Sequence, residues 1–181
     1  MNKHPSVSKA LIVFASVLAL GAASGCTKKE EAPVTPPPAP AQAPANAAAI
    51  DPNKKPDLEL TIGIDGDNMA FDKTELTAKA GTLVRVTMIN NAKATAGMQH
   101  NWVLVRPGTE TEVANAGIQA GEAADWVQAS PNVIAHTHLL KKGDGEKDSI
   151  TFVAPAAGEY PYECTFPGHA VVMKGVFKST P

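Results

Sequence analysis

The sequence predicts an all-β fold, a Greek-key sandwich or barrel with one short helical insert, and three observations predict it. From residue 57 onward, short segments place apolar residues at every second position, which is the period of a half-buried strand. Turn signals such as Gly66-Asp67-Asn68 and Ala80-Gly81 separate these segments. Helical segments do not alternate with them, so we expect antiparallel strands rather than a parallel α/β sheet.

The strands follow in order along residues 57–181. The segment 58–64 carries Leu or Ile at every second position, and 83–90 repeats this pattern with Val84, Val86 and Met88. The segment 100–106, HNWVLVR, has adjacent apolar residues, so we expect both of its faces to be covered. The other expected strands are 74–79, 147–153, 159–164 and 173–178.

One segment of the domain, residues 110–125, is rich in Ala and Glu and has few β-branched residues, which favours a helix. Gly117 and Gly121 weaken that pattern because glycine lowers the stability of a helix interior. We expect this helical insert to lie outside the sandwich.

The chain begins with a segment typical of export signals, residues 1–25. Lys3 and Lys9 precede an apolar run at 10–23, which is shorter than the roughly 18 residues that a spanning helix needs. Ala23-Ser24-Gly25-Cys26 resembles a bacterial lipobox. That resemblance implies a lipid on Cys26 and, in Gram-negative bacteria, attachment to the outer membrane.

Residues 26–56, which follow the signal, predict a disordered tether. Eight of the 30 residues from Thr27 to Pro56 are Pro and eight are Ala, with almost nothing large and apolar among them. Extended polyproline geometry would let this segment hold a domain roughly 90 Å from a membrane. We therefore expect one folded domain, at residues 57–181.

Charge and cysteine content narrow the classes of function. The chain has 16 Lys and Arg against 18 Asp and Glu and no basic run, which argues against a nucleic-acid partner. It has two cysteines, Cys26 and Cys164, and a lipid on Cys26 would leave Cys164 without a disulfide partner. A lone thiol in an oxidising compartment is expected to be buried or bound to a ligand.

The stretch 162–175, YECTFPGHAVVMKG, places Cys164, His169 and Met173 within ten residues, with a Pro-Gly turn between the first two. Alone, this pattern fits a metal site, a cysteine nucleophile with its base, or a buried strand with its turn. His100, at the start of an apolar strand, supplies a second imidazole. Two His and one Cys with a weak axial Met form the arrangement of blue-copper electron-transfer sites.

Four segments of the chain resemble the azurins, small blue-copper proteins of the cupredoxin family. The segments are GMQHNWVLV, VIAHT, GEKDSITF and ECTFPGHAVVMKG, and the likeness runs from about Asp57 to Lys178. The spacing C-x4-H-x3-M matches azurin, whereas the plastocyanin pattern has the His closer to the Cys. The resemblance implies a cupredoxin-like fold with one type 1 copper. The lipobox and the spacer make the chain similar to the lipid-modified azurins of some Gram-negative surfaces.

The resemblance also implies the copper ligands, position by position. His100, Cys164 and His169 would be equatorial, and Met173 would be axial. Azurins add a weak contact from the backbone carbonyl of a Gly that precedes the first His. Gln99 stands there in this chain, so its carbonyl remains available, but the backbone freedom of Gly is gone.

Residues around the ligands have implied roles as well. By the same resemblance, Asn101 ties the two ligand loops together near Thr165, and the backbone N–H of Phe166 donates to the Cys164 sulfur. An apolar surface for docking would surround the exposed edge of the His ligand. Its implied members are Met69, Met98, Pro167, Val171 and Val172.

Two departures from the azurin pattern lead to predictions. Azurins carry a disulfide near the start of the domain, and this domain has no second Cys. We therefore expect its thermal stability to depend on copper more than in disulfide-bearing relatives. Several azurins carry a buried His near the site, but residues 87–93, TMINNAK, have none. We therefore expect a reduction potential that is nearly flat from about pH 5 to 8.

Four further residues have simpler interpretations. His136 and His138 lie two apart in an expected strand and would share a face. This pair fits either a surface metal site or solvated histidines, and we favour solvated histidines. Trp102 and Trp126 are expected to be packing residues.

The residues and the resemblance together favour an electron carrier, not an enzyme, with His169 as the point where electrons enter and leave. The family implies c-type cytochromes, periplasmic reductases or peroxidases as partners. The lipid anchor implies contact with a membrane. We expect a monomer.

Three other functions stay open at this stage. Cys164, His169 and Asn101 are the residue types of a Cys-His-Asn nucleophilic site, although the chain offers no evident oxyanion-hole loop. A copper scavenger or chaperone would favour exposed Met- or His-rich tracts, which the sequence lacks. A surface lipoprotein whose copper domain serves in oxidant defence or host interaction is compatible with the tether.

Overall fold

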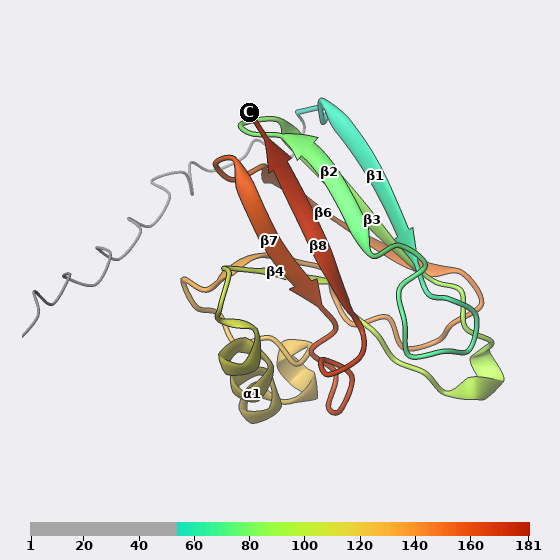
Figure 1. Ribbon diagram of the computed structural model, residues 1–181. Helices are drawn as coiled ribbons and strands as arrows, with labels where there is room; N and C mark the ends of the chain where they lie inside the picture. The colour runs from blue at the N-terminus through green and yellow to red at the C-terminus, as the bar shows by residue number, and fades with distance from the viewer. Residues whose placement is uncertain (1–53) are drawn as a thin grey trace, which may run out of the picture. The chain divides into compact units, whose positions relative to one another are not determined.

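Two sheets make up the fold in the computed structural model, which describes residues 54–181 (Figure 1). The signal peptide expected at residues 1–25, the expected lipidation site Cys26 and nearly all of the expected tether lie outside the described residues. The first sheet has the order β1 (Leu58–Gly63), β3 (Leu83–Asn90) and β6 (Glu146–Val153). The second has the order β2 (Glu75–Lys79), β8 (Lys174–Thr180), β7 (Gly158–Glu163), β4 (Val103–Val105) and β5 (Val133–His136).

The prediction of an all-β sandwich with one short helix is confirmed, but the expectation of purely antiparallel strands is wrong. Strand β1 pairs with β3 in parallel, and β2 pairs with β8 in parallel. The other pairings are antiparallel. The chain leaves the first sheet after β1, forms β2 in the second sheet and returns as β3, so β1 and β3 run in the same direction.

The core lies between the two sheets and follows the alternation seen in the sequence. Val84, Val86 and Met88 of β3 are all fully buried. The ring of Trp102, directly before β4, lies between the sheets. Its centroid is 5.7 Å from that of Tyr162 in the second sheet and 6.0 Å from that of Phe152 in the first. These aromatic side chains join the two layers and give the strand ends a rigid support.

Strand β4 is covered on both faces, as its adjacent apolar residues predicted. Leu104 faces the main core, whereas Val103 and Val105 pack with Val113 and Val127 in a second cluster. The strand is shorter than the expected 100–106. His100 precedes it and is held by backbone hydrogen bonds with Leu140, of 3.0 and 2.8 Å.

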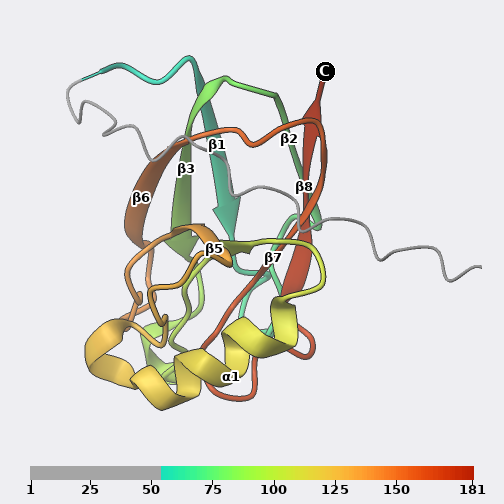
Figure 2. The same ribbon diagram turned by 90° about the vertical axis from the view of Figure 1, so that its left-hand side faces the viewer.

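The expected helix at residues 110–125 is divided into two parts. Helix α1 spans Glu110–Ala120, and a single 3-10 turn, η2, follows at Glu122–Ala124. Gly121 separates them, with a φ of 76° that favours glycine. Figure 2 shows α1 lying across the end of the sandwich, at the end where the loop between β7 and β8 lies. Within residues 54–181, no helix is long and apolar enough to cross a membrane.

Candidate metal centre

Two segments, the one before β4 and the loop between β7 and β8, bring four sulfur- and nitrogen-bearing side chains to one end of the sandwich. His100 stands before β4, Cys164 directly follows β7, and His169 and Met173 lie in the loop that leads into β8. His100, Cys164 and Met173 are fully buried. His169 is 7 % exposed, so it is the only one of the four that reaches the surface.

The loop between β7 and β8 is folded by its own backbone hydrogen bonds. The N–H of His169 donates to the carbonyl of Phe166 over 2.9 Å, and the N–H of Met173 donates to the carbonyl of His169 over 2.8 Å. The N–H of Cys164 donates to the carbonyl of Met173 over 3.0 Å and closes the loop. Gly168 has a φ of 86°, which the turn requires and other residues rarely adopt.

The nitrogen atoms of two imidazoles converge on one sulfur atom. The Sγ of Cys164 lies 3.6 Å from Nδ1 of His169 and 3.9 Å from Nδ1 of His100. The ligand atoms of these three residues lie within 4.8 Å of one another. Among residues 54–181, this is the only group of three or more His, Cys, Asp or Glu side chains placed to hold a metal ion.

The electrostatics of this cluster suit a cation bound among neutral imidazoles. Burial, and then the nearby His169, lower the pKa of His100 to about 4. Burial also lowers the pKa of His169. Both rings are therefore neutral at pH 7 and keep a lone pair for a metal.

The thiol of Cys164 needs a positive charge beside it to ionise. Burial raises the pKa of Cys164 to about 12, although hydrogen bonds from the backbone N–H groups of Asn101 and Phe166 oppose the shift. A metal ion would supply the missing charge and displace the proton. The role implied for the Phe166 N–H agrees with this geometry. The N–H of Asn101 was missed, because nothing in the sequence shows where a backbone amide points.

Asn101 joins the segment that carries His100 to the segment that carries Cys164. Its Nδ2 donates to Oγ1 of Thr165 over 2.8 Å, and its Oδ1 accepts from the backbone N–H of Thr165 over 2.9 Å. The same Nδ2 donates to the carbonyl of Asp125 over 2.7 Å. Asn101 and Thr165 are both buried, so the amide fixes the separation of two ligand-bearing segments.

Asp125 is a positioning residue that the sequence did not reveal. It follows η2 with a left-handed φ of 55°, which turns its carbonyl toward Asn101. Its carboxylate accepts from the backbone N–H of Leu139 over 3.1 Å and contacts Nδ1 of His138 at 2.7 Å. An Asp at the end of a helical segment is common, so no sequence signal pointed to this role.

The expectation that His136 and His138 share the face of one strand is wrong. Strand β5 ends at His136, and His138 lies in the loop beyond it, where it contacts Asp125. Neither belongs to the metal-binding group.

The reduction potential expected to be nearly flat with pH, because residues 87–93 have no His, stays a prediction.

Aromatic side chains and Gln99 complete the surroundings. The ring centroid of Phe166 lies 4.7 Å from that of His169. Trp126 packs edge-on against Phe166, with their ring centroids 5.9 Å apart. Gln99 does not adopt a positive φ, so the chain tolerates a residue other than Gly there. The Oε1 of Gln99 and the Nε2 of His100 are buried and have no hydrogen-bond partner.

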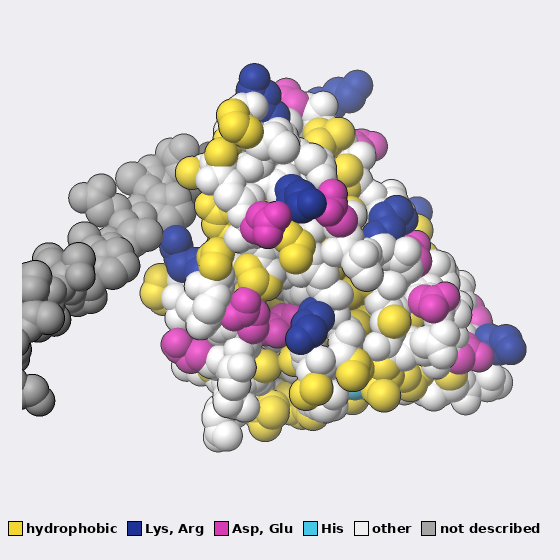
Figure 3. All heavy atoms as spheres, viewed as in Figure 1, with side chains coloured by type: hydrophobic (Ala, Val, Ile, Leu, Met, Phe, Trp, Pro, Cys, Tyr) yellow, Lys and Arg dark blue, Asp and Glu magenta, His cyan; other side chains and the backbone are white. Residues whose placement is uncertain are grey.

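The residues of the implied docking surface differ in exposure. Val171, Val172 and Met69 are 77 %, 56 % and 46 % exposed. Met98 and Pro167 are half-buried. In the view of Figure 3, hydrophobic side chains gather along the lower edge, at the end of the sandwich that carries the loop between β7 and β8.

The donor set fits copper rather than a harder metal ion. Two neutral imidazoles, one thiolate and a buried thioether are soft or borderline ligands, which excludes Mg²⁺ and Ca²⁺ as natural occupants. A two-sheet sandwich that holds this set at one end defines a cupredoxin-type blue-copper protein. His100, Cys164, His169 and Met173 form its type 1 copper site.

Comparison with known proteins supports this assignment. The family described as copper binding proteins, plastocyanin/azurin family, matches residues 58–178, and the chain belongs to this family. Auracyanin-A of Chloroflexus aurantiacus is 45 % identical over 121 residues, which are 65 % of this chain and 72 % of that protein. Azurin-1 of Alcaligenes xylosoxydans xylosoxydans is 41 % identical over 127 residues, which are 66 % of this chain and 97 % of that protein.

A solved structure agrees with the fold. The structure of auracyanin A, a "blue" copper protein from Chloroflexus aurantiacus, matches with a TM-score of 0.62 and 44 % identity, over 67 % of this chain and 98 % of that one. Membership of the plastocyanin/azurin family and the four copper ligands are therefore confirmed, the similarity to lipid-modified azurins stays a prediction, and the similarity to auracyanins is new. Proteins of this family are electron carriers rather than enzymes, which rejects the hypothesis of a cysteine enzyme.

Proposed function

We propose that the domain is an exported, membrane-tethered electron carrier that exchanges single electrons with redox partner proteins through the edge of His169. The observation that carries the proposal is the combination of three fully buried ligands with one ligand, His169, that is 7 % exposed. Copper, when bound, supplies a one-electron Cu(II)/Cu(I) couple. The residues of the chain decide how that couple is held and reached.

A rigid ligand set supports rapid electron transfer. The hydrogen bonds of Asn101 to Thr165, and those within the loop, hold the ligands in one arrangement. A site that keeps its geometry when the charge of the bound metal changes has a small reorganisation energy for electron transfer. The backbone N–H groups of Asn101 and Phe166 share the charge of the thiolate, which favours the reduced state.

The docking surface supports brief contact with several partners. Val171 and Val172 are exposed apolar residues that follow His169 within three positions. A small apolar contact without charges can form and separate quickly, which suits a carrier that must meet a donor and then an acceptor. We propose c-type cytochromes, periplasmic reductases or peroxidases as these partners.

The visible spectrum of the copper-loaded chain is the first test. Strong absorption in the orange-red region from a thiolate–Cu(II) bond is expected, and it should vanish in Cys164→Ser. Absence of the band at full copper loading would contradict the assignment of Cys164 as a ligand.

Docking is tested by charge placed on the surface. We expect Val171→Lys to lower the second-order rate of electron transfer with a c-type cytochrome by about tenfold, because a positive charge must then be desolvated on an apolar surface. Thr180→Lys, at the other end of β8, is the matched control and should leave the rate unchanged. Equal rates in both variants would refute docking at the His169 edge.

The tether and its location are tested by fractionation. We propose that Cys26 carries lipid and holds the chain at the outer membrane of a Gram-negative cell. Metabolic labelling with a fatty acid should mark the wild-type chain and not Cys26→Ala, which should appear in the soluble periplasmic fraction. Membrane association of Cys26→Ala would contradict the lipid anchor.

A further inference from the structure

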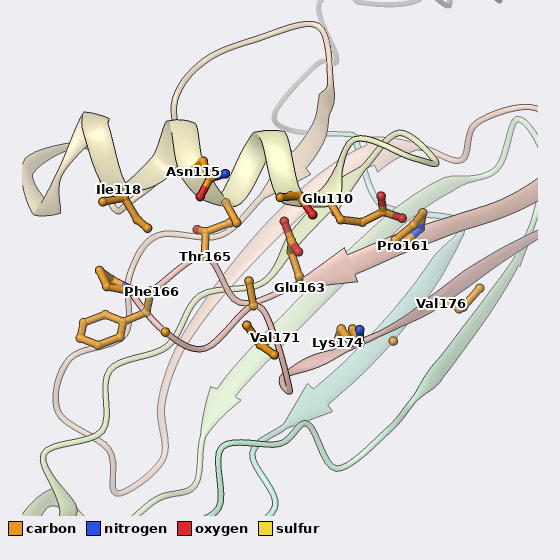
Figure 4. Close-up of a pocket in the computed structure, with 16 residues that line it drawn as sticks. Glu110, Asn115, Ile118, Pro161, Glu163, Thr165, Phe166, Val171, Lys174 and Val176 are labelled. Atoms are coloured by element: carbon orange, nitrogen blue, oxygen red, sulfur yellow. The ribbon is translucent and has the colours of Figure 1, made fainter. Parts of the chain in front are cut away.

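A groove of about 820 Å³ lies between helix α1 and the loop that carries His169 (Figure 4). Helix α1 forms one wall, the loop forms the other, and the ends of β7 and β8 form the floor. Two acidic residues, one basic residue and three large apolar residues line it: Glu110, Glu163, Lys174, Ile118, Phe166 and Val171.

Glu163 is the residue in this groove that the copper site does not explain. It ends β7 and is only 2 % exposed. Its Oε1 is buried and accepts no hydrogen bond from the described residues, 54–181. Figure 4 shows its carboxyl group directed toward α1, on the side where Glu110 lies. A buried acceptor without a donor is costly, so this position is suited to a donor that a bound partner supplies.

The groove contains no internal ion pair that would satisfy this acid. Within residues 54–181, no salt bridge involves Glu110, Glu163 or Lys174. The negative charge of Glu110 and the unpaired acceptor oxygen of Glu163 make this part of the groove complementary to a positive hydrogen-bond donor. Its apolar walls are complementary to a group that carries hydrocarbon next to its charge, as the stems of lysine and arginine do.

The groove also opens beside the ligand that reaches the surface. Phe166 contacts the His169 ring at 4.7 Å and lines the groove as well. Val171 belongs both to the groove and to the docking surface, and it is 77 % exposed. A polypeptide that covers His169 would therefore extend naturally into the groove.

We propose that this groove receives a lysine or arginine side chain of the redox partner, which donates to Glu163 and Glu110 while apolar neighbours of that residue pack on Ile118, Phe166 and Val171. The inference rests on the proposed electron-carrier function and adds to it a charged anchor beside the apolar surface. A single basic side chain in a mostly buried acidic pocket fixes orientation, which an apolar patch alone does not.

The test measures electron transfer between the copper-loaded full chain and a lysine-rich c-type cytochrome by stopped flow at several salt concentrations. We expect the double variant Glu110→Gln and Glu163→Gln to lower the second-order rate about tenfold at low salt and to weaken its salt dependence. Glu110→Gln alone, which is remote from the ligands in sequence, should lower the rate about threefold. Glu159→Gln, near the other end of β7, removes one carboxylate, as Glu110→Gln does, and should leave the rate unchanged.

Rates in the double variant equal to those of wild type would overturn the inference while leaving the proposed function intact. Absence of any electron transfer by the wild-type chain would instead contradict the proposed function itself. The two failures are therefore distinguishable in one experiment.

Two alternative occupants of the groove, the chain's own N-terminal segment and a small amine, are distinguished by two further measurements. Carbodiimide treatment of the full chain alone should leave Glu110 unlinked, and a bond between Glu110 and Lys28 or Lys29 would assign the groove to the chain's own N-terminal segment. An NMR titration with N-acetyl-lysine methylamide should give weak binding at the groove, in the millimolar range or above. Micromolar binding of this probe with an unchanged cytochrome rate would overturn the proposal in favour of a small amine.

Discussion

Single residues next to the ligands control how well the site is formed. Asn101 sets the distance between the two ligand segments, because its side chain forms hydrogen bonds with Thr165 and with the carbonyl of Asp125. The ligands could be predicted from the sequence once His100 was added to the stretch that holds Cys164, His169 and Met173, because two imidazoles, one thiol and one thioether together match a blue-copper site. Asp125 and Glu163 could not, because their importance depends on a left-handed φ and on burial, which sequence does not show.

Asn101→Ala is expected to weaken copper binding by about 10- to 100-fold, because the two ligand segments lose their link. Chelator competition followed by the visible spectrum measures the change. Gln128→Ala, an exposed position, is the control and should bind copper like wild type. An unchanged affinity in Asn101→Ala would show that the loop hydrogen bonds suffice.

Glu163 gives the metal-free chain a pH-dependent stability. Burial, and then the charge of Glu110, raise the pKa of Glu163 to about 8. A raised pKa means that the stabilisation is complete below the ordinary value, near 4.5, and is lost as pH rises through about 8. The slope reaches about 1.4 kcal/mol per pH unit within that window. Denaturant titrations of the metal-free chain from pH 5 to about 9 should show a smaller decline in Glu163→Gln. Parallel curves would contradict the assignment.

At the scale of elements, the alternation of apolar residues predicted where the strands lie, but it did not predict which strands pair. Alternation in 58–64 and 83–90 located β1 and β3, because one face of each is buried whichever strand lies beside it. The parallel pairing of β1 with β3 depends on where the intervening strand goes, which no local pattern encodes. Gly117 likewise looked like a weakness of a helix, whereas it is the point where α1 approaches the copper-site scaffold.

Gly117→Ala tests that close approach. A Cβ at Gly117 would overlap the backbone carbonyl of Trp126 and touch the side chain of Thr165. We expect a loss of about 1–3 kcal/mol in the free energy of unfolding, although alanine favours helices by about 1 kcal/mol over glycine. Gln119→Ala, on an exposed position of α1, should not destabilise the chain. A gain of stability in Gly117→Ala would show that the helix can move freely.

At the scale of the whole molecule, the copper site takes the place of a covalent cross-link. Cys164 is free, and no disulfide is formed among residues 54–181. The ligands instead connect the segment before β4 with the loop between β7 and β8. Copper should therefore stabilise the fold by holding together segments that are distant in sequence.

Removal of copper is expected to lower the melting temperature substantially. At a free metal concentration about 1,000 times the dissociation constant, binding contributes about 4 kcal/mol, which corresponds to roughly 10–20 °C for a domain of this size. Calorimetry of the copper-loaded and metal-free chains measures the difference. Equal melting temperatures would refute the copper-dependent stability.

The parallel pairing of β2 with β8 also sets the order in which the molecule can mature. Glu75 pairs with Val176, about 100 residues later, and β8 starts directly after Met173. The ligand loop cannot be anchored on both sides until that late strand has docked. We therefore expect a chain truncated before β8 to lack the anchored ligand loop, so that copper capture marks a domain whose folding is complete.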